Sequence, residues 1–209
     1  MPAALAAFIS GFSSSPLGRW SGDEPWHITT RASAIIEALI GGLRDKEFCV
    51  DGAIAVHQSV AIENGAVIKG PVVIGPGCVV AAGACLRGGV WLERDCVVGP
   101  GAELKSSFLF AGGKLAHFNF VGDSILGSDV NLEAGSIVAN SRNERADKEI
   151  RIRRGGVLHG TGVEKFGALI GDHVRIGANA VIAPGSLLLP GQVVPRLVLV
   201  DQEAAPSIS

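Results

Sequence analysis

The stretch IENGAVIKGPVVIGPGCVVAAGACLRGGVWLERDCVVGPGAEL, residues 62–104, carries a repeat of six residues. Stepping by six from residue 56 meets a bulky apolar side chain at Val56, Ile62, Ile68, Ile74, Val80, Leu86, Leu92, Val98, Leu104 and Phe110. The position three residues after each is mostly Gly, Pro, Ser or Asp, which favour tight turns. A period of six fits neither a helix nor a plain strand. It indicates a coil of short strands joined by sharp corners.

The repeat lapses near residue 116 and resumes two residues out of phase. The later positions are Leu126, Leu132 and Val138, followed by Ile170, Ile176, Ile182, Leu188 and Val194. This pattern resembles the all-β, left-handed parallel β-helix of hexapeptide-repeat acyltransferases, in which three hexads form a triangular coil of about 18 residues. Coils of this kind stack at about 4.8 Å.

Residues 18 apart then lie on top of each other, so Ile62, Val80 and Val98 form one interior ladder. Cys78 and Cys96 stack in the same way. Their spacing permits a disulfide, but we expect two inward-facing thiols. The four cysteines show no CxxC pair and no zinc-like spacing, as in a reduced cytoplasmic protein.

The segments outside the repeat suggest one domain with additions. Residues 1–50 contain a helix over Thr30–Leu43, and we expect this segment to cap one open end of the β-helix. The β-helix itself is expected over residues 51–199. Residues 141–160 are polar and basic and are expected to form a loop leaving the coil, and residues 200–209 a disordered tail.

Composition excludes several classes of protein. A net charge of −2 gives no general attraction to nucleic acid or anionic membranes. No run approaches the 18 apolar residues that a membrane span requires. The opening Met1–Ser10 lacks a basic region and a cleavage site, so we expect a short helix rather than a signal peptide, and a cytoplasmic location.

A sharper resemblance lies in two stretches, Lys114–Asn140 (KLAHFNFVGDSILGSDVNLEAGSIVAN) and Thr161–Ser186 (TGVEKFGALIGDHVRIGANAVIAPGS). The first stretch is similar to the acetyltransferase domain of bifunctional UDP-N-acetylglucosamine pyrophosphorylase/glucosamine-1-phosphate acetyltransferases. The second stretch is most similar to the archaeal-type bifunctional sugar-1-phosphate nucleotidylyltransferase/acetyltransferases. The resemblance covers roughly residues 50–195. The sequence has no glycine-rich G-x-G-T-x-x-x-P-K-like loop, so we expect the acetyltransferase without the nucleotidyltransferase domain.

The resemblance implies roles for particular residues. His117, in the irregular HFNFVGD segment where we place the register slip, corresponds to the histidine that acts as general base, a role suited to imidazole. The implied substrate contacts are Arg87, Glu103, Lys105, Phe120, Asn131 and Asn140. Arg87 and Lys105 differ by 18, so they would lie one coil apart on the same face and hold a sugar phosphate.

The implied co-substrate is acetyl-CoA, placed along the turns of residues 160–190 and contacted by Ala134, Lys165 and Ala168, with no metal required. Phe120 stands where the family has tyrosine, and Glu133 where it has glycine. The basic insert, with Lys148, Arg151, Arg153 and Arg154, replaces the bacterial lysine loop. It is expected to be solvated, the alternative being contact with CoA or sugar phosphates.

These features predict an acetyl-CoA-dependent N-acetyltransferase acting on an amino-sugar phosphate or a nucleotide amino-sugar, assembled as a homotrimer. The H-x-x-x-x-H segment of γ-type carbonic anhydrases is missing, and serine or sugar O-acetyltransferases carry other local motifs. The alternative is a trimeric scaffold, or a regulatory partner of a sugar nucleotidyltransferase, that kept the coil and lost the chemistry.

Overall fold

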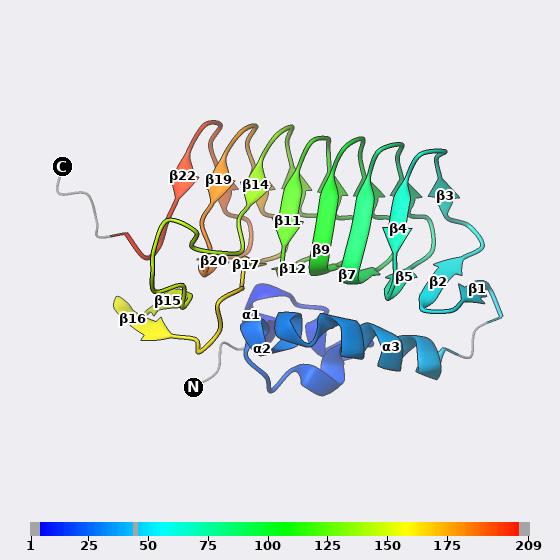
Figure 1. Ribbon diagram of the computed structural model, residues 1–209, viewed down its shortest axis with the longest axis horizontal. Coiled ribbons are helices and arrows are strands. Elements are labelled where there is room, and N and C mark those ends of the chain that lie inside the picture. Colours follow the sequence, from blue (N-terminus) through cyan, green and yellow to red (C-terminus); the bar gives the residue numbers. More distant parts are fainter. Residues whose placement is uncertain (1–4, 44–45, 205–209) are drawn as a thin grey trace.

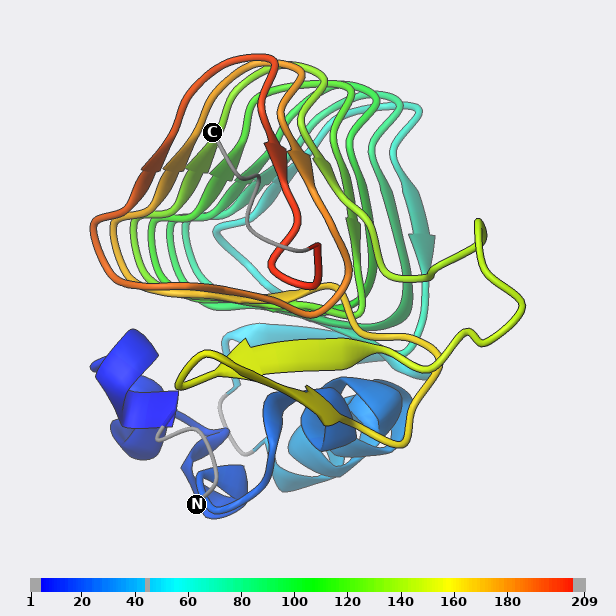
Figure 2. The ribbon, with the colours of Figure 1, turned by 90° about the vertical axis from the view of Figure 1, so that its left-hand side faces the viewer.

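The computed structural model describes residues 5–43 and 46–204. It consists of a parallel β-helix with a group of N-terminal helices along one side (Figure 1). Viewed along the axis, the coils are triangular and stacked (Figure 2), and they wind left-handed. The predicted fold is therefore confirmed.

The three sides of the triangle are called faces A, B and C. Face A holds β3 (Ala61–Ile62), β6 (Val79–Val80), β8 (Val97–Val98), β10 (Lys114–Leu115), β13 (Asn131–Leu132), β18 (Arg175–Ile176) and β21 (Val193–Val194). Face B holds β4 (Val67–Lys69), the first halves of β7 (Cys85–Leu92) and β9 (Glu103–Leu109), β11 (Phe120–Gly122), β14 (Ile137–Val138), β19 (Val181–Ile182) and β22 (Leu199–Val200). Face C holds β1 (Phe48–Asp51), β2 (Ile54–His57), β5 (Val72–Ile74), the second halves of β7 and β9, β12 (Ile125–Leu126), β17 (Ala168–Ile170) and β20 (Ser186–Leu188).

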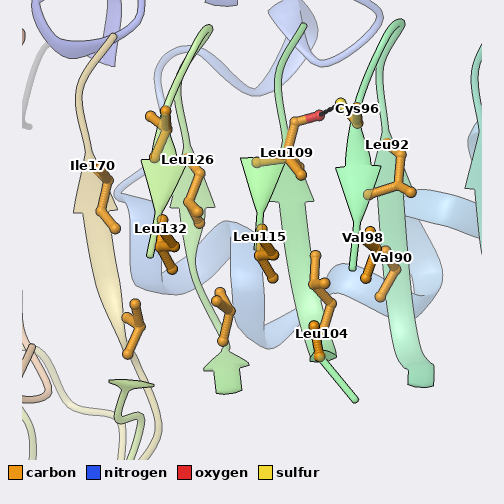
Figure 3. Close-up of a cluster of buried hydrophobic side chains, with 14 of the residues drawn as sticks. Val90, Leu92, Cys96, Val98, Leu104, Leu109, Leu115, Leu126, Leu132 and Ile170 are labelled. Carbon is orange, nitrogen blue, oxygen red and sulfur yellow. Dashed lines mark hydrogen bonds between the residues drawn. The ribbon is translucent and has the colours of Figure 1, made fainter. Parts of the chain in front are cut away.

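Side chains that point inward from the three faces form one continuous core. The predicted ladder of Ile62, Val80 and Val98 is in register through β3, β6 and β8, but only Val80 and Val98 are buried, and Ile62 in the terminal coil is 43% exposed. Figure 3 shows the stacking farther along the axis for Leu109, Leu115, Leu126, Leu132 and Ile170. Burying one such side chain contributes about 1.5–3 kcal/mol to the free energy of folding. The stacked aliphatic residues of the three faces together therefore stabilise the β-helix.

The coils differ in length. β8 follows β6 by 18 residues, whereas β10 follows β8, and β13 follows β10, by 17. The missing residue is at the corner between faces B and C. There, Gly88-Gly89 of one coil is replaced by Ser106 alone in the next and by Asp123 alone in the one after. Ser106 (φ 49°) and Asp123 (φ 46°) both adopt the left-handed conformation, which Asp accepts more readily than most residues.

Because of the shortened corner, the predicted series of interior positions is wrong at its tenth member, Phe110. Leu109 rather than Phe110 faces the interior of the β-helix. Phe110 instead packs outside it, with its ring centroid 5.7 Å from Phe12 and 5.1 Å from Trp91. Losing one residue at a corner moves every following inward position by one residue, so Leu115 and Val121 also lie one residue earlier than a strict period of six would place them.

The N-terminal helices cover the outer surface of face C. They are α1 (Leu5–Phe8), η1 (Phe12–Ser14), η2 (Gly18–Trp20), α2 (Pro25–Thr30) and α3 (Ala32–Gly42). α3 contacts β5, β7 and β9, and the outward-facing Val73, Trp91 and Phe108 are buried beneath the helical layer. The helices therefore lie along a side of the β-helix, and the expectation that they cap its open end is wrong. No helix in residues 5–43 or 46–204 is long and apolar enough to span a membrane.

The stacked cysteines are free thiols, as expected. Cys78 and Cys96 are both buried, and the Cys96 N–H lies 3.4 Å from the Cys78 Sγ. Their contact fills the interior corner between faces C and A.

The basic insert leaves the coil after β14 and returns at β17, at the same B–C corner. It is not a plain loop, because β15 (Arg151–Arg154) and β16 (Val157–Gly160) pair as an antiparallel hairpin. Its arginines form ion pairs within the chain: Arg142–Asp201 at 2.7 Å, Arg151–Glu203 at 3.1 Å and Arg154–Glu24 at 3.1 Å. The expectation of a solvated charged loop is therefore wrong for these arginines.

The segment after β22 is held in place as far as residue 204. Asp201 and Glu203 form ion pairs with arginines of the insert. In addition, the Gln202 side chain forms hydrogen bonds with the backbone of the edge strand β20. Its Oε1 accepts the Leu187 N–H at 2.8 Å and its Nε2 donates to the Leu187 carbonyl at 2.8 Å. The disordered tail predicted from residue 200 is wrong for residues 200–204, and 205–209 lie outside the described residues.

Candidate active site

Arg87 and Lys105 lie side by side on the outer surface of face B. They are register partners in β7 and β9, which confirms their predicted stacking one coil apart. The Arg87 Nε donates to the Glu103 Oε1 at 2.7 Å, and the Arg87 side chain remains 40% exposed. Three of the predicted substrate contacts are thus brought together.

Lys105 continues this row toward the B–C corner. Its Nζ donates to the two carboxylate oxygens of Asp123 at 2.8 and 3.1 Å. Asn140, the first side chain of the insert at this corner, donates its Nδ2 to the same carboxylate. We call Lys105, Asp123 and Asn140 the corner triad.

Phe120 borders the corner triad because of a glycine. A Cβ atom at Gly122 would lie 2.6 Å from the Asn140 Nδ2 and 2.9 Å from the Phe120 Cζ. Only glycine therefore lets the amide and the ring approach the strand so closely. Phe120 begins its strand beside Glu103, and only its ring reaches the end of face B that carries Lys105 and Asn140.

The charges of this row balance one another. Arg87 pairs with Glu103, and Lys105 pairs with Asp123. A phosphate arriving at face B must therefore compete with two carboxylates, and the half-exposed Arg87 guanidinium is the more accessible of the two cations.

His117 lies at the opposite edge of face B, in the corner that follows face A. Its side chain is exposed, and its carbonyl accepts the Gly135 N–H at 3.0 Å. The register slip predicted here occurs elsewhere, because one residue is lost at Ser106 and a second at Asp123. The face is about three residues wide, so roughly 10 Å of strand separates the corner of His117 from the B–C corner.

Asn131 is on face A and is not brought together with Asn140. It borders a cavity of about 410 Å³ that is also lined by Glu133, Arg175 and Arg196. Arg196 makes a bidentate pair with Glu133 at 2.8 and 2.9 Å, and the Ala178 N–H donates to Glu133 at 2.9 Å. The Arg196 guanidinium and this N–H hold the pKa of Glu133 below its usual value.

The three residues assigned to CoA lie apart from one another. Ala134 is half-buried at the A–B corner, in the turn stacked on that of His117, while Lys165 is exposed on the returning end of the insert. Ala168 is a core residue: its side chain is fully buried and its N–H donates to the Ser124 Oγ at 3.0 Å. The side chain of Ala168 is therefore closed to a ligand, and the CoA contact assigned to this residue stays a prediction that only its backbone could fulfil.

Sequence reasoning missed Asp123, which is within the quoted HFNFVGD segment. The available signal was the lost residue in the repeat, because the coil is short by one position where this aspartate replaces a Gly-Gly corner. A cavity of about 480 Å³ between α3 and face C is lined by none of the predicted site residues. Within residues 5–43 and 46–204 no three His, Cys, Asp or Glu side chains gather in a way that could hold a metal ion.

Comparisons with known proteins show what this chain is similar to. No protein-family model matches it. It is 40% identical over 100 residues to a bifunctional sugar-1-phosphate nucleotidylyltransferase/acetyltransferase of Sulfurisphaera tokodaii, covering 45% of this chain and 24% of that protein. It is 35% identical over 193 residues to the bifunctional protein GlmU of Methanococcus maripaludis strain C7, covering 89% of this chain and 46% of that protein.

Among solved structures, AntD, an N-acyltransferase from Bacillus cereus in complex with dTDP and 3-hydroxybutyryl-CoA, aligns with a TM-score of 0.39. The identity is 17%, covering 73% of this chain and 72% of that chain. The chain spans about half, or less, of the length of the curated relatives it matches, within their C-terminal region. The two curated relatives confirm the resemblance drawn from the sequence.

Proposed function

We propose that this chain transfers the acetyl group of acetyl-CoA to the amine of an amino-sugar phosphate or of a nucleotide amino-sugar. The observation that carries the proposal is the row on face B, where Arg87 and Lys105 stack in register with Asn140 and Phe120 beside them. The relatives support it, because the protein of Sulfurisphaera tokodaii is a bifunctional sugar-1-phosphate nucleotidylyltransferase/acetyltransferase.

The proposed chemistry needs one base. The amine nitrogen attacks the thioester carbonyl carbon while the His117 imidazole takes a proton from the nitrogen. The C–S bond then breaks, and the imidazolium returns the proton to the departing thiolate. The products are the N-acetyl sugar and free CoA. Backbone N–H groups at the corner are suited to stabilise the oxyanion.

The acceptor phosphate is proposed to bind at Arg87 and Lys105. Arg87 supports this because its guanidinium is half-exposed and can exchange Glu103 for a phosphate oxygen in a bidentate geometry. Acetyl-CoA is proposed to lie along the turns that begin at Ala134, beside the cavity lined by Arg175. Arg175 is exposed and forms no ion pair with any described residue, so its charge is available to a CoA phosphate.

A homotrimer is proposed because several exposed apolar side chains lie on face B and at its corner with face A. Phe118, next to His117, is 69% exposed, and Leu199 is 64% exposed. Burial between subunits would remove both from water and would bring a partner surface up to His117. Light scattering is expected to give three times the mass of the chain, and a monomeric mass contradicts the assembly.

The decisive experiment incubates the protein with acetyl-CoA and a panel of amino-sugar phosphates and nucleotide amino-sugars, and measures thiol release. At least one acceptor is expected to react. His117→Ala should lose about 100-fold or more of the turnover with an unchanged melting temperature. His159→Ala, at an exposed histidine of the β15–β16 hairpin, is the control and should keep full activity.

The alternative is a non-enzymatic trimeric scaffold or regulatory partner. The observation that favours it is the internal pairing of both face B cations, Arg87 with Glu103 and Lys105 with Asp123. Absence of thiol release with every acceptor, together with no binding of labelled acetyl-CoA, would establish the scaffold and overturn the enzyme.

A further inference from the structure

We propose that Asp123 is a positioning residue that holds Lys105 and Asn140 in the orientation needed to bind the acceptor. The inference rests on the proposed function and extends it to a residue to which neither the sequence pattern nor the resemblance gave a role.

The first support is the set of bonds to its side chain. The carboxylate accepts both hydrogen bonds from the Lys105 ammonium, at 2.8 and 3.1 Å, and a further one from the Asn140 amide. One anion thus connects the end of a face B strand to the first residues of the insert. Charge-assisted bonds of this kind fix both length and direction.

The second support is burial. The Asp123 side chain is 7% exposed and that of Lys105 is 19% exposed. A buried carboxylate without partners is unfavourable, so Asp123 has a strong preference for keeping both donors. The ammonium is therefore held within the row on face B instead of extending into solvent.

The third support is the backbone. The Asp123 N–H donates to the Lys105 carbonyl at 2.8 Å, and the Asp123 carbonyl accepts the Gly167 N–H at 2.9 Å. Asn140 lies where the chain leaves for the insert and Gly167 where it returns. Asp123 therefore joins both ends of the insert to the strand that carries Lys105.

The test uses Asp123→Asn in the full chain. Asparagine tolerates the left-handed backbone at this corner, so the fold is retained while the negative charge is removed. The expected result is a KM for the acceptor raised about 10-fold or more, with an unchanged KM for acetyl-CoA. A purely structural role would change both constants together or lower the melting temperature.

The matched control is Asp129→Asn. Asp129 has φ 55°, is exposed and lies at the corner between faces C and A, away from the corner triad. This variant should behave as the unmodified protein. If Asp123→Asn and Asp129→Asn are indistinguishable in acceptor KM, the proposal is overturned.

A double-mutant cycle with Lys105→Met tests whether Asp123 acts through the lysine. Asp123→Asn should add little to the loss already caused by Lys105→Met, because the two residues are in contact. Additive losses would contradict the proposal.

A readout that needs no activity separates this proposal from the proposed function. In ¹H–¹⁵N spectra of lysine ammonium groups, the signal of Lys105, assigned by its loss in Lys105→Met, should be protected and visible. It should disappear in Asp123→Asn and persist in Asp129→Asn. If no acceptor reacts but this pattern is found, the acetyl-transfer proposal fails and the positioning contact stands. A Lys105 signal unaffected by Asp123→Asn overturns the positioning role even in an active enzyme.

Discussion

The coils of residues 61–102 and those of residues 103–180 share one interior and differ at one corner. In the first group each coil has 18 residues, and its B–C corners contain glycine. In the second group the corner is reduced to Ser106 and then to Asp123, and in the following coil it is replaced by the insert. Lys105 and Asn140, two of the groups proposed for acceptor binding, lie beside these altered corners, whereas Arg87 belongs to the last regular coil. The regular coils thus supply mainly support, and the departures from the repeat add polar groups next to the last regular corner.

The largest expected effect tests whether the two groups of coils really share one interior. Leu86 belongs to a regular coil and Leu104 to an altered one, and both are fully buried. Leu86→Ala and Leu104→Ala should each lower the free energy of unfolding by about 2–5 kcal/mol, since each leaves a cavity in the core. Urea denaturation measures both. If the free energies of unfolding of the two variants differ by several kcal/mol, the two groups of coils do not share one equally packed interior.

A smaller effect is expected where the insert meets the C-terminal segment. Arg142 is hydrogen-bonded to Asp201, and this guanidinium holds the pKa of Asp201 below its usual value. Asp201→Asn should cost about 1–2 kcal/mol at pH 7.

The pH dependence of that loss has a defined sign. Because the folded pKa is lowered, the stabilisation is fully present above the unfolded pKa of about 4 and is lost as the pH falls through the folded value. The difference between Asp201→Asn and the unmodified protein should therefore shrink below about pH 4 in denaturation curves. A difference that persists at the lowest pH would contradict the ion pair.

A third pair of variants compares a glycine expected to matter only for stability, Gly83, with one expected to matter for acceptor binding, Gly122. Gly83, in a regular coil, has φ 75°, so Gly83→Ala should lower stability by about 1 kcal/mol and leave activity intact. Gly122→Ala would place its Cβ 2.6 Å from the Asn140 Nδ2. It should raise the acceptor KM about 10-fold through displacement of that amide. Melting curves and steady-state kinetics together test this difference. A raised acceptor KM in Gly83→Ala, with an unchanged acceptor KM in Gly122→Ala, would contradict it.

The smallest effect is expected at Glu133, which pairs with Arg196 at the exposed A–B corner. Exposed pairs contribute little, so Glu133→Gln should shift the melting temperature by no more than about 1 °C. A large shift would show that the altered coils need this pair for their stability as well.

The repeat in the sequence predicted the interior well because each inward position must be aliphatic whatever lies outside. It also placed Arg87 on Lys105, since stacking follows from the period alone. The error at Phe110 arose because Ser106 takes a left-handed corner without being glycine, so the lost residue left no visible mark. The helical cover on face C depends on outward residues such as Trp91, whose partners are distant in the sequence.

The partners of the insert arginines were beyond sequence reasoning for the same reason. Arg142 and Asp201 are far apart along the chain, and only the folded coil brings them into contact. The imidazole of His117 was identified by resemblance, but its distance from the corner triad depends on the width of a face, which the repeat does not encode.

The amide of Gln202 has a consequence for assembly. By bonding both the N–H and the carbonyl of Leu187, it occupies the place that another strand would take at the last rung of face C. An open rung of this kind would be a template for end-to-end fibre growth. One side chain thus terminates the sheet on that side and leaves neither backbone group of Leu187 free for an added strand.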